Sequence, residues 1–595
     1  MIEIHDLCYT YERPGSAPVP ALSAVSLTIA PAEFVAVVGA NGSGKTTLAR
    51  HLNALLVPTR GRVRVAGLDT ADRACWPAIR SQVALVFQRP EDQIVATTVE
   101  DDVAFGPQNL GLPTDEIEGR VRWALDTVGL WDLRHRPPHL LSAGQQQRVA
   151  IAGALAMRPR CLVLDEATAM LDPVGRQEVL ELLGRLHAGG MIVILITHWM
   201  REAAQAGRVV ALSEGRVAYD GSPRQLFADE GRLTELGLEP PPLTALAVGL
   251  ARRWSDFPAD LLTLDELTAA LVPRLPRGTL PPPAPGSPDL PDTWPLVTVR
   301  GLGHTYLAGT PLAVVALAGV ELAVYEGEVV ALLGPTGSGK STLLQHIAGL
   351  LRPTSGQVYI AGRDVNDPAT SRRFLREQVG MLFQRSEEQL FAAYVGDDVA
   401  FGPRQLGLER EAVRERVSWA MKVVGLPFLA YKDRFTQSLS SGEQRKAALA
   451  GVLALRPRVL LLDEPTAGLD PSGRRTLLAT LQHLNKCEGV TLVIATHAME
   501  DVAILARRAY VLNQGQVVAH GTPRQLFQEP ERLATWGLEM PAITALMHRL
   551  RAAGAAVPTD LLTAGEALSI FAQIACPPAG SSNLREGAGQ DNESG

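Results

Sequence analysis

The stretch GANGSGKTT at Gly39–Thr47, which returns as GPTGSGKST at Gly334–Thr342, decides the fold of this 595-residue chain. Each copy follows a short apolar run with strand character, FVAVVG or VVALLG, and precedes a run with helical character, TTLARHLNALL or STLLQHIAGL. A short apolar run that ends at a glycine-rich turn is typical of a buried strand in a parallel sheet. The chain is therefore predicted to contain an α/β domain twice.

Other stretches repeat in the same register. DDVAFGPQNLGL from Asp101 returns as DDVAFGPRQLGL from Asp397, and SPRQLF from Ser222 returns as TPRQLF from Thr522. The offsets are 295 residues for the glycine-rich loops, then 296 and 300 for these two pairs. Such a slow drift means a few single-residue insertions spread over two homologous halves joined in one chain.

The repeat and the local composition divide the chain into six segments. Pro273–Pro295 holds nine prolines in 23 positions and is predicted to be an extended spacer. The leucine-rich stretches that end the two halves share the words LTAL/ITAL and DLLT and have helical spacing. The predicted segments are a first α/β domain 1–220, its helical appendage 221–272, a linker 273–296, a second α/β domain 297–520, its helical appendage 521–576, and a disordered tail 577–595.

Composition excludes several classes of function. The net charge is -7, from 56 basic and 63 acidic residues, which gives no support to a nucleic-acid partner. The five cysteines form no CxxC pair, so neither a disulfide framework nor a zinc or iron–sulfur site is indicated, and a reducing cytosol is expected. The longest apolar runs are too short to span a bilayer, and the N-terminus lacks a signal-peptide pattern. A soluble chain that docks on another molecule fits these data.

Both glycine-rich loops have the spacing GxxxxGK[ST], in the strand–loop–helix context that phosphate binding requires. Successive backbone N–H groups and the helix dipole would hold phosphate oxygens, with Lys45 and Lys340 on the β and γ phosphates and Thr46 and Ser341 on a magnesium ion. Only six lysines occur beside fifty arginines, and Lys45 is the one lysine in the first 300 residues. The predicted ATP-binding residues here are Gly39, Asn41, Gly42, Ser43, Gly44, Lys45, Thr46, Thr47, Gly334, Thr336, Gly337, Ser338, Gly339, Lys340, Ser341 and Thr342.

Each half then has an apolar run that ends in two carboxylates, CLVLDEAT with Asp165 and Glu166, and VLLLDEPT with Asp463 and Glu464. Taken alone, such a run is more often a simple strand terminus than a catalytic pair. The phosphate-binding loop upstream makes the catalytic pair the favoured interpretation. The first acid is predicted to hold magnesium through water, and the second to act as general base on the attacking water.

A histidine ends a further strand-like run in each half, ILITH at His198 and VIATH at His497. A lone histidine after a strand is usually structural. The same placement in both halves favours a catalytic role, in which the ring hydrogen-bonds the γ-phosphate and orients the water.

Between loop and acids, each half carries a peptide that resembles the signature of the ATP-binding cassette (ABC) family: LSAGQQQR at Leu141–Arg148 and LSSGEQRK at Leu439–Lys446. The resemblance implies an α/β fold of two nucleotide-binding domains, each with a helical subdomain and a small helical C-terminal appendage, paired head to tail. Pairing within one chain and pairing between two chains both remain open, and the length of the linker favours the former. It implies that the signature of one half completes the ATP site of the other. The first signature glycine is replaced by Ala143 or Ser441, which puts loop geometry slightly in doubt. The residues carried over are Ser440, Gly442 and Glu443 for the Lys45 site, and Ser142, Gly144 and Gln145 for the Lys340 site.

The resemblance extends to three further pairs of residues. Gln88 and Gln384 would touch the magnesium and sense the γ-phosphate, and Asp172 and Asp470 would line the interface between the sites. Tyr11 and Tyr306 resemble the adenine-stacking aromatic, with a place in the core as the alternative. Because both halves keep every one of these positions, two hydrolytic ATP sites with Mg²⁺ are expected.

The segments FQRPEDQIVATTVEDDVAFGPQNLGL from Phe87 and FQRSEEQLFAAYVGDDVAFGPRQLGL from Phe383 are similar to the ATPases of energy-coupling factor importers of vitamins and cobalt. This resemblance implies a peripheral ATPase on the cytoplasmic face of the cell membrane. Its implied partners are an integral membrane scaffold, the T component, and a substrate-binding S component. The substrate itself is not predicted, because no residue of this chain should touch it.

Two alternatives remain at this point. A fused ATPase of a sugar importer also has tandem cassettes, but it lacks the FGPxxLGL segment. A tandem cassette protein that acts on ribosomes or DNA is the alternative from another class. Its usual charged helical linker, long coiled coils or zinc-binding cysteines are not present in this sequence.

Overall fold

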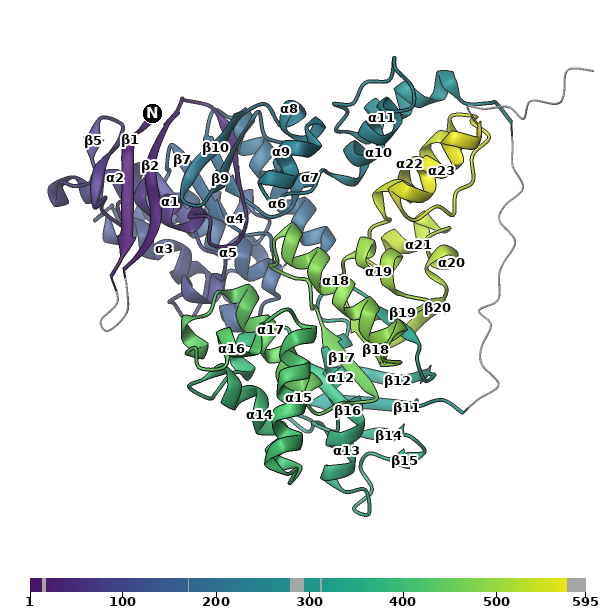
Figure 1. The fold of residues 1–595 in the computed structure, drawn as a ribbon. Coiled ribbons are helices and arrows are strands. Elements are labelled where there is room, and N and C mark those ends of the chain that lie inside the picture. Colours follow the sequence, from purple (N-terminus) through teal and green to yellow (C-terminus); the bar gives the residue numbers. More distant parts are fainter. Residues whose placement is uncertain (13–17, 170, 279–293, 311–312, 575–595) are drawn as a thin grey trace, which may run out of the picture. The chain divides into compact units, whose positions relative to one another are not determined.

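The computed structural model describes residues 1–12, 18–169, 171–278, 294–310 and 313–574. The chain forms two compact units, and Figure 1 shows their elements. The first unit comprises Met1–Pro241 and Pro285–Met540, and the second comprises Pro242–Ala284 and Pro541–Gly595. Residues 1–241 are called the first half below, and residues 294–540 the second half.

Each half is built on a six-stranded, mainly parallel sheet. The central strands are short, apolar and fully buried, as strands covered on both faces must be. In each half, only the strand that comes last in the chain runs antiparallel to its neighbour in this sheet. In the first half the order is β10 (Arg216–Gly221), β9 (Arg208–Ser213), β3 (Phe34–Val38), β8 (Ile192–Ile196), β7 (Cys161–Asp165) and β6 (Val83–Val86). In the second half it is β16 (Val379–Leu382), β17 (Val459–Asp463), β18 (Thr491–Ala495), β13 (Val329–Leu333), β19 (Arg508–Asn513) and β20 (Gln516–Gly521).

A smaller antiparallel sheet shares its core with the parallel one. Its strands alternate buried and exposed residues, so one face packs and one faces solvent. Leu48 and Leu52 of α1 (Lys45–Leu52) belong to the same core as Ile4 and Val37 from the two sheets. The strands are β2 (Val19–Ile29), β1 (Ile2–Tyr11), β4 (Arg60–Val65) and β5 (Leu68–Asp69), and in the second half β12 (Val314–Val324), β11 (Val297–Tyr306), β14 (Ser355–Ile360) and β15 (Arg363–Asp364).

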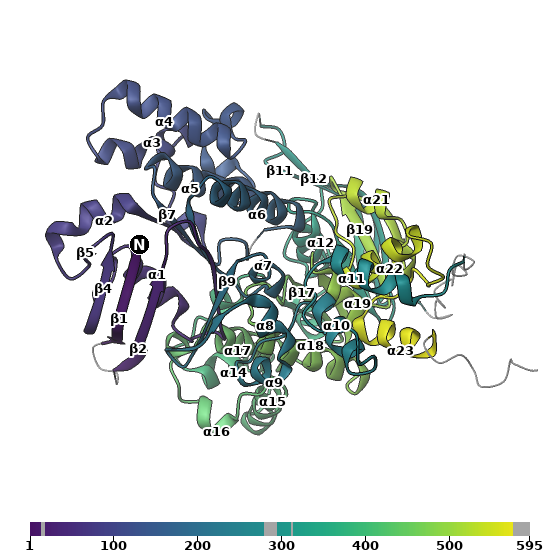
Figure 2. The same cartoon turned by 90° about the horizontal axis from the view of Figure 1, so that it is seen from above.

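A group of helices packs beside the sheets of each half (Figure 2). In the second half, Val399, Val417 and Leu449 from three of these helices share one core with Leu460 of β17. The groups are α3 (Val99–Asn109), α4 (Thr114–Thr127) and α5 (Ala143–Ala156), and α14 (Val395–Gln405), α15 (Arg410–Val423), α16 (Phe428–Tyr431) and α17 (Ser441–Leu453).

The repeated FGP motif lies where two of these helices meet. A Cβ on Gly106 of α3 would lie 2.5 Å from Met157 Sδ, just beyond α5. A Cβ on Gly402 of α14 would likewise lie 2.8 Å from Leu455 Cδ2. Glycine lets the helices approach this closely, which explains why the FGP motif occurs in both halves.

The remaining helices of the first unit complete the two halves. They are α2 (Trp76–Gln82), α6 (Pro173–Ala188), α7 (Met200–Ala203), α8 (Pro223–Ala228) and α9 (Glu230–Glu235), and α12 (Lys340–Ile347), α13 (Arg372–Gln378), α18 (Pro471–Lys486), α19 (Met499–Leu505), α20 (Pro523–Leu526) and α21 (Pro530–Thr535). None of the helices in the described part of the chain combines the length and the apolar character needed to cross a bilayer.

The second unit is a small helical domain to which both ends of the repeat contribute. It contains α10 (Pro242–Ala251), α11 (Leu264–Leu271), α22 (Ala542–Ala552) and α23 (Ala564–Ile574). Leu246 and Leu267 share one core with Leu546 and Phe571. Two separate appendages starting at 221 and 521 were expected. Instead α8, α9, α20 and α21 belong to the first unit, and the later helices merge, because a pair of short helices cannot bury its leucines alone.

Ordered structure also continues past the expected start of the linker. Val272–Arg274 form a short 3-10 helix, in which Pro273 occupies the first turn, where its missing N–H costs nothing. Arg277 then bridges to Ala555 within the second unit. Most of the predicted linker, residues 279–293, and the predicted tail from 577 lie outside the described residues.

Truncating Phe571 should loosen this second unit. Its ring is fully buried among leucines from both pairs of helices. Phe571→Ala is expected to lower the local free energy of opening by about 3–5 kcal/mol, because it leaves a cavity in a small core. Amide hydrogen exchange across α10 and α22 measures the loss. The exposed neighbour Gln573→Ala is the control, and equal protection in both variants would contradict a shared core.

Candidate functional site

The two glycine-rich loops hold their lysines in the same way. Lys45 Nζ donates hydrogen bonds to the carbonyls of Gly39 and Ala40, each at 2.9 Å. Lys340 Nζ donates to the carbonyls of Gly334 and Pro335, at 2.7 and 3.0 Å. Each ammonium thus lies folded over its own loop, and burial lowers the pKa of both lysines.

One glycine in each loop is required by its backbone and by its surroundings. Gly44, at the N-terminus of α1, has φ +101°, and a Cβ there would lie 2.6 Å from the carbonyl oxygen of Ala21. Gly339, at the N-terminus of α12, has φ +102° and meets Ala316 in the same way. Only glycine allows this left-handed turn so close to a neighbouring backbone.

The loops contain polar atoms that lack a protein partner. Ser43 Oγ and Ser338 Oγ are buried and form no hydrogen bond with other described residues. A buried hydroxyl without a partner is costly, and one at the same place in both loops indicates a ligand with acceptor oxygens. Together with the N-termini of α1 and α12, these hydroxyls fit a phosphate chain.

The first acid of each pair lies at the carboxyl end of a central strand, beside the loop hydroxyl. Thr46 Oγ1 donates to Asp165 Oδ1 at 3.1 Å, and Ser341 occupies the equivalent place beside Asp463, whose pKa its hydroxyl lowers. Burial raises the pKa of both aspartates to about 6. Asp463 Oδ1 is buried without a hydrogen-bond partner among the described residues. A hydroxyl next to a buried, under-satisfied carboxylate fits Mg²⁺, which takes one or two protein oxygens and completes its shell with phosphate and water.

The second acid of each pair contacts the predicted histidine. Glu166 Oε1 lies 2.6 Å from His198 Nε2, and Glu464 Oε1 lies 2.8 Å from His497 Nδ1. Gln88 Nε2 donates to Glu166 Oε2 at 3.0 Å. In the first half, His198 and Gln88 therefore both contact the Glu166 carboxylate, which brings three residues predicted to be catalytic together.

The surroundings of these glutamates favour the ionised carboxylate, which is the form that can accept a proton. Burial alone would raise their pKa, but His198 and Lys45 outweigh it at Glu166, and His497 and Lys340 do so at Glu464, so that both pKa values lie below the ordinary one. Their backbone is left-handed, with φ 52° and 46°, and each N–H donates to the end of the neighbouring strand. Strained backbone of this kind is typical of active sites.

The two tyrosines lie near the helices that follow the loops. Tyr11 Oη is 3.2 Å from Thr47 Oγ1, and Tyr306 Oη is 3.2 Å from Thr342 Oγ1. Tyr306 lines the cavity that contains Lys340, whereas Tyr11 makes an edge contact with Tyr9. Adenine stacking by either tyrosine stays a prediction.

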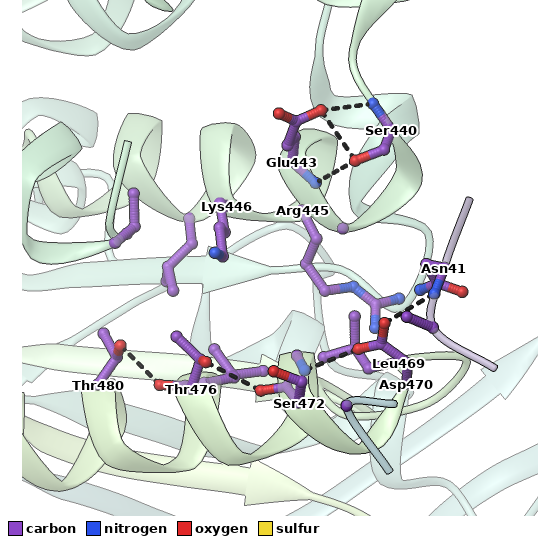
Figure 3. A pocket seen from close by; sticks show the side chains of 17 residues that line it. Asn41, Ser440, Glu443, Arg445, Lys446, Leu469, Asp470, Ser472, Thr476 and Thr480 are labelled. Atoms are coloured by element: carbon purple, nitrogen blue, oxygen red, sulfur yellow. Dashed lines mark hydrogen bonds between the residues drawn. The ribbon is translucent and has the colours of Figure 1, made fainter. Parts of the chain in front are cut away.

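Hydrogen bonds join the loop of each half to an aspartate of the other. The Asn41 N–H donates to Asp470 Oδ2 at 2.8 Å, which Figure 3 shows, and the Thr336 N–H donates to Asp172 Oδ2 at 3.2 Å. The other oxygen of Asp470 caps α18, and that of Asp172 caps α6. Each aspartate therefore connects a helix of its own half to the phosphate loop opposite.

The signature segments begin helices whose N-termini also face the opposite half. Ser142 and Ser440 cap α5 and α17, in capping boxes with Gln145 and Glu443. Ser440 and Gly442 line a cavity of about 340 Å³ together with Asn41 (Figure 3). At the other loop, a cavity of about 460 Å³ is lined by Ala143 and Gln146, rather than Ser142 and Gly144, and also by Lys340, Gln384, Glu464 and His497.

Comparison with known proteins agrees with this geometry. The family model described as ABC transporter matches residues 22–169 and 317–467. A protein of Methanosarcina acetivorans named "Putative ABC transporter ATP-binding protein" is 36% identical over 596 residues, which cover 97% of this chain and 94% of that protein. This chain belongs to the ABC transporter family. The predicted family, α/β fold class and ATPase activity are thereby confirmed, and the two halves are ABC cassettes.

Shorter relatives match about half of this ABC protein. The "Energy-coupling factor transporter ATP-binding protein EcfA1" of Symbiobacterium thermophilum is 56% identical over 262 residues, covering 44% of this chain and 91% of its own. The protein of the same name from Caldanaerobacter subterraneus subsp. tengcongensis is 47% identical over 268 residues, covering 45% of this chain and 97% of its own.

Sequence reasoning missed the ion pairs between the cassettes, two of which are equivalent under the repeat. Arg89 Nη2 lies 2.7 Å from Glu387 Oε1, and Arg385 Nη2 lies 2.6 Å from Glu91 Oε2. The signal was present, because RPED and RSEE both place an acid two residues after an arginine. Their pairing is visible only when the cassettes face each other.

Proposed function

We propose that this ABC ATPase energises an importer of the energy-coupling factor type, which takes up a vitamin or a transition-metal ion. The observation that carries the proposal is the 56% and 47% identity to two energy-coupling factor ATP-binding proteins. The proposed partners are an integral membrane scaffold and a substrate-binding component. The chain would act as a peripheral protein on the cytoplasmic face of the membrane.

In the proposed mechanism both sites hydrolyse ATP with the same set of groups. The loop N–H groups, with Lys45 or Lys340, bind the β and γ phosphates. Thr46 with Asp165 and Gln88, or Ser341 with Asp463 and Gln384, would hold Mg²⁺, which when bound neutralises charge that develops on the phosphates.

Proton transfer falls to the buried glutamates. Glu166 or Glu464 accepts a proton from the water that attacks the γ-phosphorus, and ADP leaves with the electrons of the broken bond. His198 and His497, which contact these carboxylates, orient the water and the γ-phosphate. Ser142 and Ser440 would close on the γ-phosphate from the opposite cassette.

The helical group of the second half offers a surface for a membrane partner. A cavity of about 930 Å³ between α14, α15 and α16 is lined by apolar side chains, among them Tyr394 and Leu429, and by charged ones, among them Arg404, Arg414 and Lys432. Leu429 is 80% exposed, and nearby in the sequence Phe391 is 65% exposed. Exposed apolar side chains gathered at a cavity are typical of a protein docking site.

The test is retention of a membrane protein. Wild-type protein mixed with detergent-solubilised membranes of its source should retain an integral membrane protein, which in turn should raise ATP hydrolysis. Leu429→Glu should weaken both effects by tenfold or more, since a buried interfacial apolar contact is replaced by a charge. Basal ATP hydrolysis should not change.

Trp294→Glu is the matched control, because Trp294 is 90% exposed but lies at a different surface, before β11. Retention of ribosomes in place of a membrane protein would refute the transport proposal. Equal loss with both variants would refute docking at α16.

A further inference from the structure

One ion pair between the halves joins two residues that occupy the same position of the repeat. His198 begins HWMRE and His497 begins HAMED, so Arg201 and Glu500 each come three residues after the histidine. In the structure Arg201 Nη2 donates directly to Glu500 Oε1. Their side chains are 37% and 26% exposed, so the pair is partly shielded from solvent.

Equivalent residues of two homologous domains meet each other only on the pseudo-two-fold axis that relates the domains. The two halves have different sequences, so the two residues that meet on this axis need not be of the same type. Two copies of the first half, paired in the same way, would bring Arg201 against a second Arg201. Two copies of the second half would bring Glu500 against a second Glu500.

Most other contacts between the halves make no such distinction. The exception is the ion pair of Arg475 with Glu239, whose equivalent positions hold Gln177 and Glu539. Arg89 pairs with Glu387 and Arg385 pairs with Glu91, so each half supplies one arginine and one glutamate. These pairs would form equally well between two first halves or between two second halves. The hydrogen bonds to Asp470 and Asp172 are reciprocal in the same way.

The neighbouring charges are neutralised within each half. Glu202 lies 3.5 Å from Arg176, and Asp501 pairs with Arg474. Both of these acids are buried. Arg201 and Glu500 are therefore the charges at this place that differ in sign between the halves.

We propose that Arg201 and Glu500 form a charge code that directs the first half to pair with a second half and opposes pairing of like halves. An exposed ion pair contributes little stability, but like charges held together on an axis are repulsive, so the code acts mainly against the wrong partners. The proposal rests on the paired halves and not on the membrane partner, so purified protein alone can test it.

The experiment uses three full-length variants. Arg201→Glu makes both axis positions acidic and Glu500→Arg makes both basic, while the double variant Arg201→Glu/Glu500→Arg exchanges the charges. Each single variant is expected to lose about 5- to 10-fold in ATP hydrolysis, because every available pairing is now repulsive. The double variant should match the wild type.

Mixing the two single variants gives the decisive result. An acidic chain and a basic chain are complementary, so an equimolar mixture with ATP should regain activity and contain dimers of chains by light scattering, whereas each variant alone should not. Arg122→Glu, which reverses a charge on the outer helix α4, is the control. Unchanged activity in the single variants would overturn the proposal. A double variant as impaired as the single ones, or a mixture without recovery, would overturn it as well.

Discussion

Glu166→Gln and Glu464→Gln are each expected to remove most ATP hydrolysis, and the double variant to trap ATP. Each carboxylate contacts a histidine and has a pKa below the ordinary value, so it is ionised and able to accept a proton at neutral pH. An amide of the same shape accepts no proton, and loss of a general base typically costs 10²- to 10⁴-fold in rate. Steady-state phosphate release measures turnover, and nucleotide retained after gel filtration measures trapping.

The exposed residue Glu181, which accepts a hydrogen bond from Gln177 on the surface of α6, offers a matched control as Glu181→Gln. That variant should behave as the wild type. If Glu464→Gln were nearly silent while Glu166→Gln abolished turnover, the two sites would be unequal, and the prediction of two hydrolytic sites would be wrong.

The second large effect is expected at the loop lysines. Lys45→Met and Lys340→Met keep the length and volume of the side chain but remove the ammonium that bonds two loop carbonyls. A hydrogen bond to a charged group contributes about 1.5–3 kcal/mol, so the loss of phosphate contacts should weaken ATP binding at that site by about 10- to 100-fold. Titration with a fluorescent ATP analogue measures the affinity of each variant.

Lys486→Met, at the exposed end of α18, is the control and should leave ATP affinity unchanged. Lys45→Arg should not rescue the first site, since a planar guanidinium does not fit where a compact ammonium lies under 3 Å from two carbonyls. Full ATP affinity in Lys45→Met would show that the loop does not hold the phosphates in the way proposed.

The sequence was informative where function constrains short stretches of chain. Lys45, Asp165 and Glu166 could be placed because glycine-rich loops and apolar strands that end in acids leave local patterns. The strands before both loops lie where those patterns predicted them, at Phe34–Val38 and Val329–Leu333.

Contacts between distant segments left no such pattern. The helical spacing of Leu246 and Leu546 predicted helices, but it could not show that both leucines enter one core. Arg201 and Glu500 look like ordinary surface charges until the halves face each other. Partner choice depends on three-dimensional complementarity, which periodicity does not encode.

The shared helical domain has a consequence for the ATP cycle. Because α10–α11 follow the first cassette in the chain and α22–α23 follow the second, their common core ties the two cassettes together through residues that take no part in the ATP sites. In a cycle in which hydrolysis releases contacts at the nucleotide, the tethered cassettes would not diffuse apart. Tethering of this kind keeps the effective concentration of one cassette around the other at about the millimolar level. In such a cycle, renewed closure would start from an encounter that does not depend on the amount of protein in the cell.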